Sequence, residues 1–378
     1  MSRVVLKKGR EASLLRRHPW IFSGAIHDMP LCQPGDILTV YTYDGKQIAS
    51  AYFHPKNSIA GRILSFGEEN ALTAFARHLQ EACDLRTRPA CRLINAEGDF
   101  LPGLIVDKYN DVLVIQISTY GMERLKEHIL SFLIEHFKPR MIYEKSVSAA
   151  RREEGLKDFE GVIYGETIPE VMIEENGATH IVPIIEGQKT GFFLDQREMR
   201  YKIQTLSKGK RVLNCFAYTG GFGRAALHGG AAHIDNVEIS KEICKLADKH
   251  NPDPSKFHYH CDDVFDFLQK KPLNYDIVIL DPPAFVKKKA DLHAACGAYK
   301  ELNRLVMAKA PAGTLLLTSS CSSYMEAPLF QNIIAQAGAE AGKNIRILGK
   351  HLHADDHPIS LYHPEGDYLK SLLLYLTK

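Results

Sequence analysis

The sequence predicts an α/β protein with a doubly wound, mainly parallel sheet at its C-terminal end, an N-terminal β-barrel and an α+β domain between them. Three observations lead to this prediction. Strand-like apolar runs alternate with amphipathic helices from about residue 210, the first 68 residues alternate apolar and polar side chains, and the segment between them mixes the two patterns. We expect domains at 1–68, 69–185 and 186–378.

The composition is typical of a globular protein in a reducing compartment. Of the 378 residues, 45% are hydrophobic and 24% are charged, and no apolar run approaches the about 20 residues that span a bilayer. The basic N-terminus lacks the apolar stretch of a secretory signal, and the eight cysteines include no Cys-x-x-Cys pair. We therefore expect a cytoplasmic protein with free thiols and no membrane contact; a homodimer stays open.

The N-terminal segment is typical of a small barrel with a basic entry. The run GDILTVYTYDGKQIASAYFHP alternates around Asp44-Gly45, which predicts a hairpin, and REASLLRRHPWIF predicts a short helix that stops before Pro19. Net charge is only +2, but basic side chains cluster in residues 1–20 and again at Lys287–Lys289. Such clusters suit a phosphate backbone, although solvated surface charge explains them equally well. The expected RNA contacts of the barrel are Lys7, Arg10, Arg16, Arg17 and Trp20.

The middle segment combines helices with strands. Residues 70–90 predict an amphipathic helix whose apolar face carries Leu72, Phe75, Ala76, Leu79 and Cys83. We expect strands at 91–98 and at 104–118, with a turn at Asn110-Asp111 in the second, then a helix at 122–137 and a strand at 141–147. Strands around 161–166, 170–177 and 179–185 complete the α+β domain.

The last part of the chain alternates strands and helices. The expected strands lie at 211–216, 233–240, 275–281 and 313–320, and the expected helices at 223–230, 241–250, 264–271, 299–310 and 327–342. Two closing strands, 344–352 and 368–377, follow one another closely, which predicts an antiparallel edge.

A glycine-rich turn in VLNCFAYTGGFGRAALHGG predicts a cofactor site. The dinucleotide pattern Gly221-x-Gly223-x-x-Ala226 is present, but four residues, 216–219, separate the strand from the glycines, so the loop suits a nucleoside without phosphates better than a pyrophosphate. Glu238 ends the next strand and is placed to accept from the ribose hydroxyls, and Asp263 follows the third strand, where it can accept from an adenine amine. Acidic surface loops are the alternative. The expected cofactor contacts of the loop are Asn214, Phe216, Tyr218, Gly220, Gly221 and Phe222.

The most specific motif is the DPPAF that follows the strand YDIVIL. The two prolines fix the backbone, so Asp281 and Phe285 are expected to project into the crevice, with Phe285 stacking on a flipped base; a tight turn is the alternative. The strand LLLTSS is followed by Cys321, where a packing thiol is out of place, and Cys321 is therefore a candidate nucleophile. A buried inert thiol is the alternative reading, and a role for Cys296 stays open.

Several stretches of the chain resemble those of a known family. The stretches GQKTGFFLDQR, VLNCFAYTGGF, DDVFDFL, DPPAF, CGAYKELN, SSCSS and DDHPISLYHPEGDYLK resemble the PUA-domain, S-adenosylmethionine-dependent rRNA large-subunit methyltransferase I family, and LKKGREASLLRRHPWIFSGAI resembles its PUA domain. The resemblance implies a PUA-like barrel, a Rossmann-like methyltransferase sheet and C5 methylation of a cytosine in 23S rRNA or an assembly intermediate. It also implies that Arg197, Glu238, Asp263 and Asp281 hold or border the cofactor.

The chemistry explains why a cysteine is needed. Carbon 5 of cytosine is a poor nucleophile until a thiolate adds to carbon 6, and Cys321 is then the nucleophile, with Asp281 at the base edge. The thiolate must form near neutral pH, and the helix expected from Ala327 is a candidate to favour it. HLHADDH, residues 351–357, has metal-ligand residue types without a standard spacing, so we expect a local hydrogen-bonded turn and no metal.

Three alternatives stay open. An exocyclic-amine methyltransferase of the N2-guanine type uses a similar acidic-Pro-Pro loop but needs no cysteine. A non-catalytic RNA-binding protein keeps the same fold without turnover. A nicotinamide dehydrogenase has only the Gly-x-Gly pattern in its favour.

Overall fold

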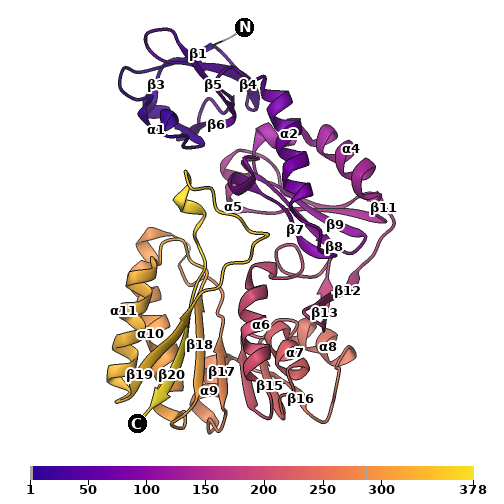
Figure 1. Ribbon diagram of the computed structural model, residues 1–378, viewed down its shortest axis with the longest axis vertical. Helices are drawn as coiled ribbons and strands as arrows, with labels where there is room; N and C mark the ends of the chain where they lie inside the picture. Colours follow the sequence, from indigo (N-terminus) through magenta and orange to yellow (C-terminus); the bar gives the residue numbers. More distant parts are fainter. Residues whose placement is uncertain (1–2, 287) are drawn as a thin grey trace. The chain divides into compact units, whose positions relative to one another are not determined.

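The computed structural model describes residues 3–286 and 288–378, and the chain divides into two compact units. Unit 1 contains the residues up to Ile173 together with Val182–Leu194 and Asp355–Gly366, and unit 2 contains Glu174–Ile181, Asp195–Ala354 and Asp367–Lys378. Figure 1 colours the elements along the chain. The boundaries at residues 68 and 185 stay predictions. None of the described helices is long and apolar enough to cross a membrane.

The first sheet of unit 1 has six strands in the order β2-β6-β5-β4-β1-β3. The strands are β1 Arg3–Leu6, β2 Trp20–Phe22, β3 Ile26–Asp28, β4 Asp36–Tyr41, β5 Gln47–Phe53 and β6 Ile59–Phe66. The hairpin expected at Asp44-Gly45 joins β4 to β5, and Gly45 takes the left-handed conformation (φ 89°) that the turn needs. A short helix, α1 (Ala12–Leu15), ends before Pro19, as expected.

The second sheet of unit 1 has five strands in the order β11-β10-β9-β8-β7. The strands are β7 Ala90–Asn95, β8 Leu104–Tyr109, β9 Val112–Ile117, β10 Met141–Ser146 and β11 Phe159–Gly165. The helices are α2 Ala71–Asp84, α3 Tyr120–Arg124, α4 Lys126–Phe137 and α5 Ala149–Glu153. Helices α2 and α4 share one core with the sheet, through Phe75, Leu79, Ile129 and Leu133.

The apolar face of α2 was predicted only in part. Phe75, Leu79 and Cys83 are buried, but Leu72 is 47% exposed and Ala76 is also exposed. Buried Ala74, His78 and Ala82 lie on that face instead. The small alanines let the helix approach the sheet, and the buried face is rotated from the expected one toward Ala74, His78 and Ala82.

A two-stranded hairpin, β12 (Glu170–Glu175) and β13 (Ala178–Pro183), follows β11. Its turn is formed by Asn176 (φ 51°) and Gly177 (φ 80°), which are the residue types that tolerate left-handed backbone in a tight hairpin. The three strands expected between residues 161 and 185 are therefore present.

Unit 2 is built on a seven-stranded sheet in the order β16-β15-β14-β17-β18-β20-β19. The strands are β14 Arg211–Cys215, β15 His233–Glu238, β16 Phe257–Cys261, β17 Ile277–Leu280, β18 Leu315–Ser320, β19 Asn344–Lys350 and β20 Lys370–Thr377. The first five pair in parallel, and β20 pairs antiparallel with both β18 and β19. The expected antiparallel edge is confirmed.

Helices cover both faces of this sheet. The helices are α6 Arg197–Leu206, α7 Gly221–His228, α8 Lys241–Lys249, α9 Val264–Lys270, α10 Leu292–Lys309 and α11 Ala327–Glu340. On β17, Ile277 and Ile279 share a core with α6 and α7, whereas Val278 and Leu280 share a core with α9, α10 and α11. A strand buried on both faces is a continuous apolar run, which is why IVIL was recognised as a strand.

The glycine at position 223 in α7 gives the first prediction. A Cβ there would lie 2.4 Å from Asn236 Oδ1 and 3.0 Å from Phe257 Cε2, so the helix packs on β15 and β16 only without a side chain. We expect Gly223→Ala to lower the free energy of unfolding by about 1–3 kcal/mol through overpacking. Gly297, within α10, has open space around it, and Gly297→Ala should raise the free energy by about 0.5–1 kcal/mol. Urea denaturation measures the free energy of unfolding of both variants. Equal changes in the two variants would contradict the packing argument.

Candidate active site

The candidate site lies at the carboxyl edge of the unit 2 sheet. Strands β15 and β16 lie on one side of β14, while β17 and β18 lie on the other, so the strand order reverses between β14 and β17. Doubly wound sheets bind ligands in the crevice at such a reversal, outside the carboxyl ends of the strands. Residues that directly follow β14, β15, β17 and β18 therefore meet at this edge.

The turn between β14 and α7 has an unusual backbone. Phe216 (φ 57°), Tyr218 (φ 49°) and Gly220 (φ 78°) are all left-handed, and two of the three are not glycine. Non-glycine residues keep this conformation only when their surroundings impose it, and such strain is frequent at binding sites. Here the Ala217 amide donates to the Val237 carbonyl (3.0 Å), and the Tyr259 hydroxyl donates to the Tyr218 carbonyl (3.1 Å).

Glu238 ties this turn to the end of β15. Its carboxylate is buried and accepts from the backbone amides of Tyr218 and Ser240, each at 2.9 Å. The two bonds fix the carboxylate beside the loop and leave further lone pairs on both oxygens for another donor. The structure thus brings two of the predicted cofactor residues, Tyr218 and Glu238, into direct contact.

Asn214 and Phe222 lie beneath the loop rather than on its surface. The Asn214 amide donates to Asn236 Oδ1 at 2.9 Å, and Phe222 packs in the core with α6. Asp263 is exposed and caps α9, because its Oδ1 accepts from the amides of Phe265 (2.8 Å) and Asp266 (3.1 Å). The capping role accounts for an acidic residue at this position without a ligand, so direct contacts from these three residues stay predictions.

Asp281 has a neighbour that the sequence did not indicate. Gln196 donates from Nε2 to Asp281 Oδ1 at 3.0 Å, while Gln196 Oε1 is buried and has no hydrogen-bond partner among the described residues. An unsatisfied buried acceptor costs free energy unless a ligand supplies a donor. Arg197, the next residue, is buried and donates from Nε to Glu198 at 3.0 Å.

Cys321 is half-buried and lies one residue beyond the end of β18, and that its thiol faces the crevice stays a prediction. Lys370, at the start of β20, pairs in register with Ser320 and donates from Nζ to the Ser322 carbonyl at 2.7 Å. Its ammonium is therefore fixed on the loop that carries the thiol. Burial lowers the pKa of Lys370, while the charges of Asp367, Cys321 and Glu326 oppose that shift.

Sequence reasoning missed Lys370, although it ends the quoted motif DDHPISLYHPEGDYLK. A lysine that begins an edge strand looks like ordinary surface charge. Lys370 lies near Cys321 only because β20 pairs with β18, and that pairing joins residues far apart in the chain.

Phe285 is half-buried, and its ring lies against Tyr299 with the centroids 4.8 Å apart. The buried Tyr299 hydroxyl lies beside Ser320 and Ser322. Phe285 therefore links the DPPAF loop to the loop that carries Cys321, and its stacking on a base stays a prediction. Lys287, the first residue of the expected basic cluster, lies outside the described residues.

In the first sheet, Lys7, Arg10, Arg16 and Arg17 are exposed, as phosphate contacts require. Trp20 is half-buried, and its indole nitrogen donates to Glu97 Oε1 at 2.9 Å. The indole is therefore held in one orientation.

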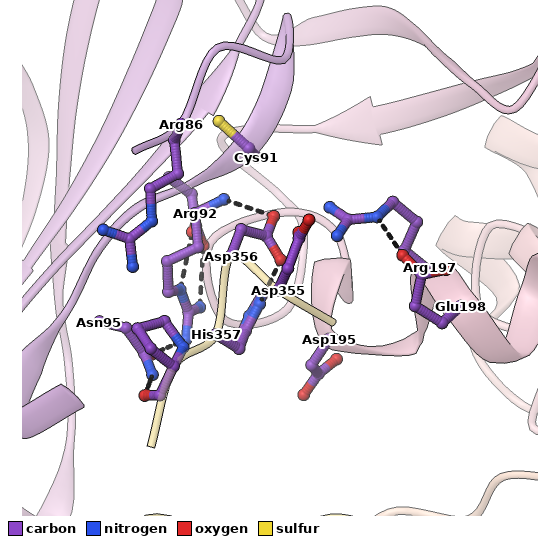
Figure 2. A network of polar contacts seen from close by, with 12 residues as sticks. Arg86, Cys91, Arg92, Asn95, Asp195, Arg197, Glu198, Asp355, Asp356 and His357 are labelled. Carbon is purple, nitrogen blue, oxygen red and sulfur yellow. Dashed lines mark hydrogen bonds and ion pairs between the residues drawn. The ribbon is translucent and has the colours of Figure 1, made fainter. Parts of the chain in front are cut away.

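The segment with metal-ligand residue types contains a turn at residues 355–356, as expected, and also contacts the second sheet of unit 1. Figure 2 shows Asp356, which accepts from the Arg92 amide (3.1 Å) and lies 2.9 Å from His357 Nδ1. The Pro358 carbonyl accepts from Asn95 Nδ2 at 2.9 Å. In the part of the chain that the structure describes, no three His, Cys, Asp or Glu side chains are grouped to hold a metal ion.

The pairing of Lys370 with the thiol loop gives the second prediction. A cation beside a thiol favours the thiolate, so Lys370→Met should slow alkylation of Cys321 by iodoacetamide near neutral pH by about 3- to 10-fold. Mass spectrometry follows each cysteine, and exposed Cys261 serves as the reference within the same chain. Lys300→Met, which removes a lysine paired with Glu340, should leave Cys321 unaffected. An unchanged rate of Cys321 alkylation in Lys370→Met would show that the lysine does not influence the reactivity of the thiol.

Comparison with known proteins agrees with this geometry. Residues 4–66 match the PUA-like domain family, and residues 158–336 match the S-adenosylmethionine-dependent methyltransferase family. Curated proteins named ribosomal RNA large subunit methyltransferase I are 43% identical in Aeromonas hydrophila and 40% identical in Shewanella denitrificans, in each case over 98% of both chains. The relative from Vibrio vulnificus is 41% identical over 97% of both chains.

Solved structures show the same fold. A Streptococcus mutans protein described as a SAM-dependent methyltransferase has a TM-score of 0.83 at 24% identity, covering 99% of this chain and 100% of that one. A methyltransferase structure in complex with SAH has a TM-score of 0.84 at 24% identity with the same coverage. The predicted fold class, a Rossmann-like methyltransferase sheet with a PUA-like domain, is confirmed. Given full-length relatives at 40–43% identity, the chain belongs to the ribosomal RNA large subunit methyltransferase I family.

Proposed function

We propose that this protein transfers a methyl group from S-adenosylmethionine to carbon 5 of a cytosine in 23S rRNA, with Cys321 as the nucleophile. The observation that carries the proposal is the position of Cys321: a half-buried thiol directly after β18, at the same sheet edge as Glu238 and Asp281. The relatives' name specifies large-subunit ribosomal RNA as the substrate of those proteins. The cytosine and its carbon 5 are inferred from the thiol.

The residues of this edge suit S-adenosylmethionine. Glu238 offers buried carboxylate oxygens for the ribose hydroxyls, and the free Gln196 Oε1 beside Asp281 offers an acceptor for the amino group. Arg197, Asn214, Phe216, Tyr218, Gly220, Gly221, Phe222 and Asp263 complete the proposed cofactor site. When bound, the cofactor supplies an electrophilic methyl group on a sulfonium sulfur.

Cys321 makes the base reactive. Its thiolate would form a bond to carbon 6, and the electron pair of the 5,6 double bond would shift to carbon 5. Carbon 5 would then take the methyl group as the methyl–sulfur bond of the sulfonium breaks and leaves a neutral thioether. Loss of the proton from carbon 5 restores the double bond and expels the thiolate. Lys370 favours the thiolate before attack and after release, and Asp281 is placed to bond the base edge. Phe285 is proposed to stack on the flipped base.

RNA docking is proposed for the first sheet, through Lys7, Arg10, Arg16, Arg17 and Trp20. The four basic side chains are exposed, and contacts of this kind supply affinity that falls as salt rises.

The third prediction concerns cofactor affinity. Glu238→Gln places an amide where the carboxylate now accepts two backbone amides, so one donor must face another. We expect S-adenosylmethionine to bind more weakly by about 1–3 kcal/mol. Isothermal titration calorimetry measures the change, and Glu242→Gln, on the exposed surface of α8, is the matched control that should bind normally. Unchanged affinity in Glu238→Gln would remove Glu238 from the site.

The fourth prediction tests the reaction itself. RNA with 5-fluorocytosine at the target should trap the protein covalently, because fluorine does not leave carbon 5 as a proton does and the thiolate is not expelled. The adduct, seen on denaturing gels, should require S-adenosylmethionine. It should be absent in Cys321→Ala and persist in Cys296→Ala.

Cys321→Ala should still bind cofactor and RNA, since the loss lies in the chemical step. An adduct that survives in Cys321→Ala but is lost in Cys296→Ala would move the nucleophile to α10. Absence of any adduct, with the methyl group found on an exocyclic nitrogen, would favour the amine methyltransferase instead.

A further inference from the structure

Unit 1 contains a cavity of about 710 Å³ between the first sheet, at β2 and β6, and the second sheet, at β8, β9 and β10. We call it the Trp20 cavity after one of its lining residues. Its volume lies within the range of about 300–1,000 Å³ that is usual for small-ligand sites. The proposed methylation site uses residues of unit 2 alone, so the Trp20 cavity is a separate feature.

The charges that line the cavity balance. Arg62 is paired with Glu154 at 2.7 Å, and Lys145 donates to the carbonyls of Ile185 (2.9 Å) and Ile184 (3.3 Å). Two lining side chains, Lys56 and Glu153, are exposed and form no ion pair with the described residues. The lining carries three cationic side chains and three carboxylates, so the cavity favours an uncharged ligand over a multiply charged one.

A free carboxamide lies on the wall of the cavity. Gln116 on β9 faces Ile105 on β8 across the antiparallel pair, and both residues line the cavity. Gln116 is half-buried, and its side chain has no hydrogen-bond partner among the residues that the structure describes. A carboxamide presents one acceptor and two donors side by side, which matches the edge of a nucleobase.

An aromatic ring, the indole of Trp20, also lines the cavity. The bond to Glu97 fixes the Trp20 indole, and the rings of His18, Phe22 and His363 meet it at 77°, 82° and 67°. None of these three rings stacks parallel on the indole. Indole faces stack well on bases of any sequence.

We infer that the Trp20 cavity binds an unpaired nucleobase of the RNA substrate other than the one that is methylated. The base edge bonds the Gln116 carboxamide, the indole of Trp20 provides a stacking surface, and exposed Lys56 at the cavity contacts the adjoining phosphate. This inference rests on the proposed function for its RNA ligand. It adds a second point at which the protein holds a single-stranded nucleotide.

Trp20 is the single tryptophan of the chain, so tryptophan fluorescence reports this cavity directly. The full-length protein is titrated with eight-nucleotide single-stranded RNA homopolymers and with an abasic oligomer of the same length. We expect saturable quenching by oligomers that carry bases and little quenching by the abasic one. Gln116→Leu should weaken binding by about 5- to 50-fold, in line with the loss of one base contact.

Gln80→Leu, on the exposed side of α2, is the matched control and should bind as the wild type does. Equal quenching by abasic and base-carrying oligomers, or wild-type affinity in a folded Gln116→Leu variant, would overturn the inference. Methyl transfer to a 23S rRNA fragment is measured on the same wild-type preparation. Transfer without quenching refutes the cavity alone, whereas base-dependent quenching without transfer refutes the proposed reaction and leaves the cavity inference standing.

Discussion

The active edge of this protein depends on the parallel, in-register pairing of β14 with β15 on one side and β17 on the other. Cys215 lies opposite both Val237 and Leu280, so the chain leaves all three strands at the same level. Phe216, Glu238 and Asp281 follow directly. The position of each of these residues is set by the strand that precedes it. The residues therefore meet without long loops. The left-handed backbone at Phe216 and Tyr218 is held by hydrogen bonds to β15 rather than by glycine.

The charge at this edge suits the cofactor that we propose it binds. Glu238, Asp263 and Asp281 all follow strands of the sheet, and the loop before α7 is bulky where a dinucleotide site has glycine. Carboxylates near the crevice repel the phosphates of a nicotinamide dinucleotide and attract a cofactor that carries a sulfonium and an ammonium. The same fold thus supports a different chemistry because of the residues at its strand ends, and the Gly-x-Gly pattern alone is a poor guide.

Local patterns predicted most of the fold. Apolar runs such as IVIL, the Asp44-Gly45 turn and the strand-helix alternation after residue 210 specify their elements without help from distant residues. The same holds for Cys321, because its position follows from the end of its own strand. Lys370 and Gln196 depend on contacts with residues far away in the chain, so no local pattern distinguishes them from surface residues. The contacts of segment 355–358 with Arg92 and Asn95 in β7 were not predicted, for the same reason.

Burial separates Cys321 from most other thiols of the chain. Burial raises the pKa of Cys83, Cys91 and Cys244 to about 12, and it also raises that of Cys215, so these thiols stay protonated at neutral pH. A fully exposed thiol has a different disadvantage, because a thiolate in contact with solvent is readily oxidised. Cys321 lies between these extremes: it is half-buried, and Lys370 beside it has no carboxylate within ion-pair distance among the described residues. A cation held by a carbonyl rather than by a carboxylate keeps its charge available to the sulfur. In the proposed reaction, Lys370 is thus the group that favours a thiolate at Cys321.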